Sequence, residues 1–563
     1  MNDLGSTEVG ADATPPSVGV SAMHELRATR KRHRLGDLEW FDAAYKVYIV
    51  GLFGGIVLLW LSDLVGDEEL SAAQAANVAL HGPAVLGMVA VVALALGARS
   101  GSQGGPLALE AADVVHVMLA PVDRRSALLR PTIQRVRSAA FAGGAVAACL
   151  AQLAGRRLPG TPIAWFTAGA WFGVVIACLW VGGALVAHVL HVPLVVSTMI
   201  GIGLMGWQGV AIGTDVPGPA DTFGSIGLWG WRQRAIDLVP MAAAIALVAV
   251  GVALVARTSL EALARRSSLV AQLRFAVTMQ DLRTVILLRR QLSYEHTRRR
   301  PWLQLRPGGG GPVVWRRGWH SLLRLPVGRL VRMLGLALAA AGCQVAVLHG
   351  TRPALFGTLV CTFVLGLEVL EPLSQEVDQP DRTDGFPVVR GELMFRHLAA
   401  PAVLLVPFVL IGAAAGVGID AVITDGDRVA ASIPVALLLG LAAVLTGAAG
   451  AAISIVRDAP DPLAGNSQEV YLPPEMAGMT TVLRTLIPLI VSAVGAAMAL
   501  GVRSAIADGR TDPVGNAARG AVAAVLVAAT VATWVRYRDR LRARFRSFMA
   551  EGRDYTQQQR ARS

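Results

Sequence analysis

The segment Val429–Val456 reads VAASIPVALLLGLAAVLTGAAGAAISIV and contains no charged side chain. About 20 residues of α-helix cross a hydrocarbon core of about 30 Å, so this run predicts a membrane-spanning helix. We read about twelve such runs, six on each side of a basic central stretch. The runs are 45–61, 78–97, 138–153, 164–186, 192–212, 239–256, 331–348, 354–370, 398–419, 429–456, 486–502 and 521–535. The sequence therefore predicts an all-α polytopic membrane protein with about twelve transmembrane helices.

Composition supports the same class. The chain is 54% hydrophobic and 16% charged, whereas a soluble globular protein carries about 25% charged residues. Its net charge of +12 comes from arginines that lie between alternate apolar runs. This is the positive-inside distribution of membrane proteins rather than the footprint of a nucleic-acid-binding domain. The four cysteines lie inside apolar runs without a Cys-x-x-Cys pair, so we interpret them as packing residues.

The charge pattern also predicts a topology. Arginines before the first run, and in the stretches 257–317 and 536–562, indicate cytoplasmic segments, whereas the acidic stretches 67–69 and 420–427 indicate outer loops. Arg156, Arg157, Arg232 and Arg234 are exceptions on the predicted outer side. We expect a multi-pass protein of the plasma (inner) membrane with both termini in the cytoplasm. Six spans per half make the two halves parallel six-helix repeats.

The predicted division has five parts. Residues 1–44 form an N-terminal cytoplasmic segment with an interfacial helix, 45–256 and 328–537 the two transmembrane halves, and 538–563 a basic tail. Between the halves, 257–327 is a basic connector in which apolar residues recur with helical spacing over 269–286. Four glycines at 308–311 then interrupt the helical pattern.

One polar motif occurs twice, each time after the second run of a half. Sliding the chain by 266 positions superposes the loop at 110–130 on the loop at 376–396. The matching pairs are Glu110 with Glu376, Pro121 with Pro387, Val122 with Val388, Arg124 with Arg390, and Arg130 with Arg396. A repeat of both hydropathy and motif indicates two copies of one membrane unit, with function concentrated in the repeated loop.

These features resemble the ABC-2 type permeases, the membrane subunits of ATP-driven exporters. The resemblance covers residues 45–537 and rests on Leu119-Ala120-Pro121-Val122-Asp123-Arg124 and on Gly385-Phe386-Pro387-Val388-Val389-Arg390. It implies that each repeated loop is a coupling helix that docks into a nucleotide-binding protein. It also implies a transport function, and a pathway lined by Ala, Gly, Val and Leu suits an amphipathic or lipophilic substrate. An interfacial helix that only holds its arginines at lipid headgroups is the alternative for these loops.

The ATP-binding machinery is not in this sequence. A P-loop requires Gly-x-x-x-x-Gly-Lys-Ser/Thr, and the two lysines, Lys31 and Lys46, lie in no such context. The resemblance therefore implies a separate ABC ATPase subunit, most simply in two copies, with ATP and Mg²⁺ bound to that partner. The chain is not expected to be an enzyme by itself, and we assign it no catalytic, cofactor-binding or metal site.

Other features leave alternatives open. Phe223, Ile226 and Trp229 predict a short amphipathic helix in the outer stretch 214–237, which in the resembled family closes the exit. His188 and His191 lie one turn apart without a nearby third metal ligand. A secondary transporter of the major-facilitator type has the same count of spans, although 99–137 is long for its second connection. A polytopic membrane enzyme or structural protein is the third possibility.

Overall fold

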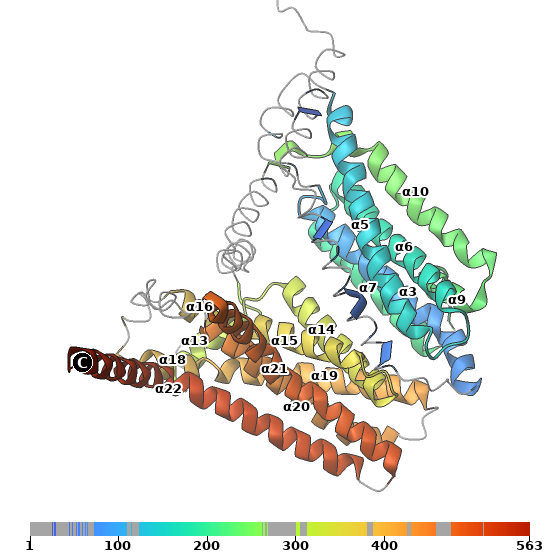
Figure 1. Ribbon diagram of the computed structural model, residues 1–563. Helices are drawn as coiled ribbons and strands as arrows, with labels where there is room; N and C mark the ends of the chain where they lie inside the picture. Colours follow the sequence, from blue (N-terminus) through green and yellow to red (C-terminus); the bar gives the residue numbers. More distant parts are fainter. Residues whose placement is uncertain are drawn as a thin grey trace, which may run out of the picture. The chain divides into compact units, whose positions relative to one another are not determined.

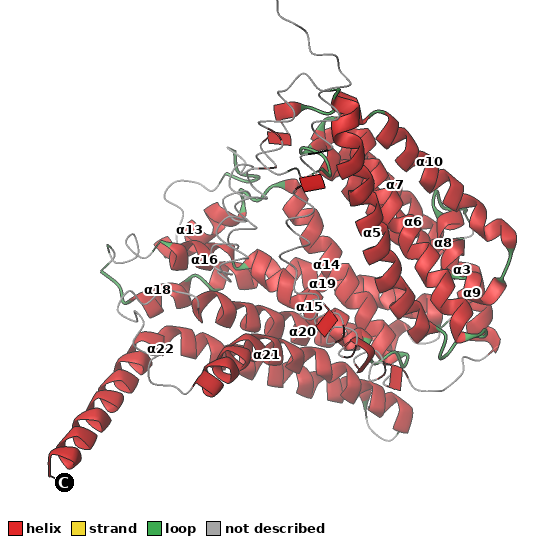
Figure 2. Ribbon diagram, turned by 45° about the horizontal axis from the view of Figure 1, so that its top comes forward, coloured by secondary structure: helices red, strands yellow, loops and turns green. Residues whose placement is uncertain are grey.

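The computed structural model describes residues 72–107, 123–214, 216–261, 300–304, 312–379, 387–424, 429–457, 474–509 and 512–562, with isolated residues in the intervening gaps. The chain divides into two compact units, Met1–Leu288 and Arg289–Ser563. This boundary lies inside the predicted connector 257–327. Over the described residues every regular element is a helix (Figure 2).

The first unit is built around one central helix, α6 (Pro162–Val189). The helices α3 (Ala72–Ser102), α5 (Arg124–Ala154) and α10 (Val239–Ala253) pack against it, and α7 (Leu194–Gly213) packs against α3 (Figure 1). In the most apolar stretch of α6, 78% of the residues are buried. Glycines allow this: a Cβ at Gly169 would lie 2.5 Å from the Ala147 carbonyl oxygen of α5. Small residues thus let helices approach closely where lipid supplies no hydrophobic driving force.

Three short helices connect α7 to α10. They are α8 (Asp221–Gly227), α9 (Trp229–Arg232) and the 3₁₀ helix η1 (Ala235–Leu238); a second 3₁₀ helix, η2 (Val255–Arg257), follows α10. The predicted helix in the outer stretch is therefore present. Ile226 is fully buried, and α8 packs against α3 and α6. The segment thus lies within the packed unit.

The second unit also has a central helix, α20 (Val429–Arg457), with α15 (Ala354–Val369), α19 (Ala399–Ile423), α21 (Pro474–Asp508) and α22 (Pro513–Arg562) around it. The helix α14 (Val327–Leu348) packs against α15 and α19. Three short helices, α13 (Val313–Leu322), α16 (Glu371–Asp378) and α18 (Arg390–Arg396), lie near one end of this bundle (Figure 1). We call this the α16 end. The last part of α22 extends beyond the other helices of its unit (Figure 1).

The all-α membrane architecture predicted from the sequence is confirmed. In the described part of the chain, ten helices are long and apolar enough to cross a membrane, or eleven if α15 and α16 form one broken span. Eleven of the twelve predicted runs coincide with these helices. Of the remaining run, 45–61, the structure describes seven residues, and all of them are helical.

The repeat seen in the sequence recurs in the helix boundaries. The helices α5 and α18 begin at Arg124 and Arg390, which are 266 positions apart. The long apolar helices before the two loops, α3 and α15, end at Ser102 and Val369, and the helices of the fourth predicted run in each half, α6 and α20, begin at Pro162 and Val429. One difference is that α5 runs without a break from Arg124, whereas α18 and α19 are separated by His397 and Leu398.

Candidate functional site

In the first predicted loop the structure describes Val114 and the residues from Asp123 onward; Glu110, Pro121 and Val122 lie outside the described residues. Asp123 caps α5, because its carboxylate accepts hydrogen bonds from the Ser126 amide (2.9 Å), the Ser126 hydroxyl (2.8 Å) and the Arg125 amide (3.3 Å). These hydrogen bonds, led by those from Ser126, lower the pKa of the Asp123 carboxyl. Arg124 and Arg130 are exposed on the first two turns of α5.

The second loop is described at more of the predicted positions. Pro387 is exposed and Val388 half-buried just before α18, which begins at Arg390 and ends at Arg396. Arg396 is exposed, and its Nε lies 3.1 Å from Glu392 Oε1 one turn earlier. Glu376 lies instead on α16, where its side chain is only 2% exposed. The structure therefore separates Glu376, which is internal, from Arg396, which is exposed, while Arg390 is half-buried at the start of α18.

A sharp bend between α15 and α16 shapes the α16 end. The two helices are inclined by 61° at Leu370. Pro372 explains the break, since a proline has no N–H to donate to the carbonyl four residues earlier and its ring clashes with that carbonyl. That carbonyl belongs to Glu368, and its oxygen accepts a hydrogen bond from Arg329 Nη2 at 3.0 Å. An arginine of α14 thus satisfies the acceptor that the bend exposes.

The same arginine joins two buried carboxylates. Arg329 Nε lies 2.6 Å from Glu368 Oε2, and Arg329 Nη2 lies 2.8 Å from Glu371 Oε2. Arg332, one turn along α14, contacts the other oxygen of Glu368 at 2.6 Å. Glu368 and Glu371 are 7% and 6% exposed. Charges buried to this degree need paired and well-aligned partners, so this ion cluster fixes the start of α14 to the bend.

A second ion pair holds α16 to α13. Arg317 of α13 pairs with the buried Glu376 of α16, and His397 Nε2 lies 3.6 Å from the same carboxylate oxygen. On α13, Trp315 and Trp319 make an edge-to-face contact with ring centroids 5.8 Å apart. Both rings pack against a core of α14, α15 and α19 residues. The short helices of this end are therefore fixed by charge and by aromatic packing together.

The helix α18 is attached to the extension of α22. Glu392 Oε2 lies 2.7 Å from Arg536 Nε, and the Gly391 amide donates to Asp539 Oδ2 at 3.1 Å. A side chain at position 391 could not be accommodated, because its Cβ would lie 2.5 Å from the Arg536 carbonyl oxygen. The loop that follows the bend is thus anchored to the last predicted span.

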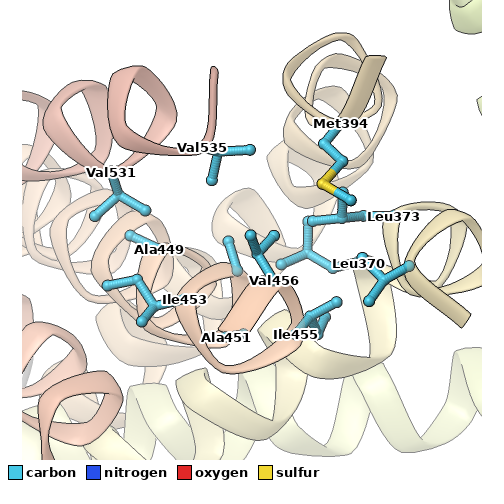
Figure 3. Close-up of a cluster of buried hydrophobic side chains, with 12 residues drawn as sticks. Leu370, Leu373, Met394, Ala449, Ala451, Ile453, Ile455, Val456, Val531 and Val535 are labelled. Carbon is cyan, nitrogen blue, oxygen red and sulfur yellow. The ribbon is translucent and has the colours of Figure 1, made fainter. Parts of the chain in front are cut away.

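An apolar cluster lies beneath α16 and α18. Figure 3 shows Leu373 of α16 and Met394 of α18 next to Val456 of α20, with Val535 of α22 nearby. All four side chains are at most 1% exposed. A force on α18 would therefore reach α20 and α22 through packed side chains.

The first unit has a different internal polar site, around α8. The buried Gln208 of α7 donates from Nε2 to the Ala84 carbonyl (2.8 Å) and to Asp221 Oδ1 (2.6 Å), and its Oε1 accepts from the Ala220 amide (3.1 Å). Gly224 packs so closely on α3 that a Cβ would clash with the Pro83 carbonyl oxygen. In the second unit only a few residues separate α21 from α22, so this segment is particular to the first unit.

The histidine pair has a packing role in the structure. His188 Nδ1 lies 3.2 Å from the Gly101 carbonyl oxygen, next to the end of α3. His191 has a positive φ of 51° in the turn between α6 and α7. Among the described residues there is no group of three or more possible metal ligands.

Sequence reasoning missed the ion cluster at the bend. From the sequence alone Glu368 is a charge near a membrane interface, and its partners on α14 lie 36 and 39 positions earlier in the chain. The sequence does contain a pattern that could have predicted this cluster. Arg329 and Arg332 lie one helical turn apart at the start of one apolar run, and Glu368 and Glu371 lie one turn apart at the end of the next.

Comparisons of the chain with protein-family models, with curated proteins and with solved structures gave no match.

Proposed function

We propose that this chain is the membrane-spanning permease subunit of an ATP-driven exporter of the ABC type. In this proposal a separate ATPase subunit docks on the two repeated loops and moves an amphipathic or lipophilic substrate through the helices. The observation that carries the proposal is that the starts of α5 and α18, Arg124 and Arg390, are 266 positions apart, the same offset that relates the two copies of the loop motif. Each of these helices follows the second predicted span of its half.

The second loop is built in a way that suits a docking element. Its accessible face carries Pro387 and Arg396, while its inner face is tied to α22 through Glu392 and Gly391. Arginine makes charge-assisted, bidentate contacts with carboxylates, so exposed arginines suit an acidic groove on a protein partner. Loops that served only as lipid anchors would not require such attachment to a distant span.

The test is affinity purification of the tagged full chain from its native membrane, followed by identification of any bound protein with a P-loop. We expect an ABC ATPase, and we expect Arg124→Glu and Arg390→Glu to weaken its retention about tenfold or more, since a charge-assisted contact becomes a repulsive one. Arg234→Glu and Arg352→Glu are matched controls, because both arginines are exposed and lie at the opposite ends of their units.

The two loops are expected to respond differently to salt. The stretch 376–384 carries four acidic residues in the sequence, three of them (Asp378, Asp381 and Asp384) besides the buried Glu376, so ATPase retention through the second loop should depend more strongly on ionic strength. If both arginine reversals leave ATPase retention and substrate-stimulated hydrolysis unchanged while the chain is normally inserted, the docking assignment is wrong.

A further inference from the structure

A groove lies between α14, α19 and α20, at the end of the second unit opposite the α16 end. The groove is shallow: its volume is about 30 Å³, and about 370 Å³ when the part that is open to the outside is counted. Apolar side chains and glycines form most of its wall, including Ala341 and Val345 of α14, Gly412 and Gly416 of α19, and Val435 of α20. From Gly412 to Asp420 the groove follows α19 over a rise of about 12 Å.

The glycines of α19 leave space in this groove. A Cβ at Gly412 or Gly416 would have its nearest neighbours at 3.4 Å and 3.7 Å, which are ordinary contact distances. At Gly447 of α20, by contrast, a Cβ would lie 2.7 Å from backbone atoms of Thr362. Gly447 is therefore needed for close helix packing, whereas Gly412 and Gly416 keep a gap between the helices unfilled.

Polar groups are few and are placed along the groove. Asp420 is the one charged residue of the lining, in the last turn of α19. Its Oδ1 lies 2.8 Å from His349 Nε2, and its side chain is 15% exposed. Deeper in, Gln344 donates from Nε2 to the Leu439 carbonyl at 3.1 Å. An ionised carboxylate only accepts hydrogen bonds and attracts positive charge.

We infer that this groove binds a lipophilic cation, with its apolar chain along Gly412 and Gly416 and its cationic group beside Asp420. An apolar cavity with a few convergent polar groups is the usual form of a small-molecule site. An anionic amphiphile of the same shape would place like charge next to Asp420. The inference deepens the proposed function by naming a substrate class, and it rests on that function only for the transport step.

The test measures binding to the purified full chain in an uncharged detergent, without any ATPase. The probes are a fluorescent alkyl trimethylammonium and an alkyl sulfonate of equal chain length and fluorophore. We expect the ammonium probe to bind at least tenfold more tightly than the sulfonate, which corresponds to about 1.4 kcal/mol. Asp420→Asn should remove most of that preference, because it removes the negative charge next to the cationic group. Asp508→Asn, an exposed acid at the end of α21, should leave it unchanged.

A second pair of variants tests the location. Gly416→Leu fills the groove and should abolish binding of both probes. Gly418→Leu is its control, since Gly418 lies two positions away on the exposed face of α19, where a Cβ would have no atom within 4 Å. If Gly416→Leu fails to fold, Gly416→Ala, which meets only ordinary contacts, should weaken binding in the same direction.

Equal binding of the two probes, an unchanged preference in Asp420→Asn, or equal losses in the 416 and 418 variants would each overturn the inference. Because no ATPase is present, the outcome is independent of docking. If the ammonium probe binds but affinity purification from the native membrane recovers no ATPase, the proposed function is contradicted and the groove assignment stands. If an ATPase is recovered but the probe does not bind, the groove assignment is contradicted and the proposed function stands.

Discussion

Arg329 donates from Nη2 to the main-chain carbonyl of Glu368 at 3.0 Å, while its Nε lies 2.6 Å from the carboxylate of the same residue. The bend between α15 and α16 is therefore stabilised by one arginine that satisfies both the exposed backbone acceptor and the buried charge.

Glu368→Gln should destabilise the second unit by about 3 kcal/mol, because removal of one member of a buried ion cluster leaves charge without a full partner. Unfolding of the purified chain in a denaturing detergent, followed by circular dichroism, measures this. Arg332→Gln is the control: the Arg332 side chain is 49% exposed, so its loss should cost no more than about 1 kcal/mol. Equal effects of the two substitutions would show that burial does not determine the energetics of this cluster.

A double-mutant cycle between Glu392 and Arg536 should reveal coupling of about 0.5–1 kcal/mol, as is typical of partly exposed ion pairs. The variants are Glu392→Gln, Arg536→Gln and the double mutant, and the measurement is hydrogen exchange of the α18 amides. We expect each single variant to speed exchange and the double mutant to add little more. Strict additivity would mean that the pair does not hold α18 to α22.

Gly224→Ala should displace α8, since its Cβ would clash with the Pro83 carbonyl oxygen and the two helices would have to separate. Overpacking of this kind costs about 1–3 kcal/mol. The readouts are thermal unfolding and the reactivity of a cysteine placed at the buried Ser225. Gly213→Ala is the matched control, because no atom lies within 4 Å of a Cβ there. A Gly224→Ala protein with unchanged unfolding and an unreactive cysteine would contradict the packing of α8.

The cap of α5 should depend on pH. The pKa of Asp123 is lowered in the folded chain by hydrogen bonds from Ser126 and Arg125. Its stabilising effect is therefore fully present above the unfolded-state pKa, near 3.9, and is lost as the pH falls through the lower folded-state value. Hydrogen exchange of the first turn of α5, measured from about pH 6 to pH 3 after correction for intrinsic rates, follows this. Asp123→Asn keeps a capping side chain that does not titrate, so its protection should not change over that range.

The predicted topology places both termini in the cytoplasm. A reporter that is active only outside the cytoplasm should be silent when fused after Ser563 and active when inserted after Thr424, at the end of α19. This follows from the alternation of basic and acidic stretches along the chain. The reversed pattern of activity would invert the map and would place the α16 end, with its arginines, on the outer side.

The sequence predicts the membrane-spanning helices well and the contacts of the candidate site poorly, for a physical reason. A run such as Val429–Val456 predicts its helix because lipid requires every backbone group to be satisfied within the helix, and the 266-residue offset of the sequence repeat recurs in the starts of α5 and α18. The site depends on pairing between helices. The contact of Arg329 with Glu368, and the burial of Ile226 under α3, are set by packing that a local pattern does not encode.

The helix α22 passes without interruption from its apolar part, through the contacts at Arg536 and Asp539, to Arg562. From Leu541 to Arg562 it extends about 32 Å. The helix therefore continues well past the residues that hold it to α18. A change in tilt of about 10°, well within the spread seen for membrane helices, would sweep its tip through roughly 5 Å. A spectroscopic label near Arg562 would magnify movements that are small at α18.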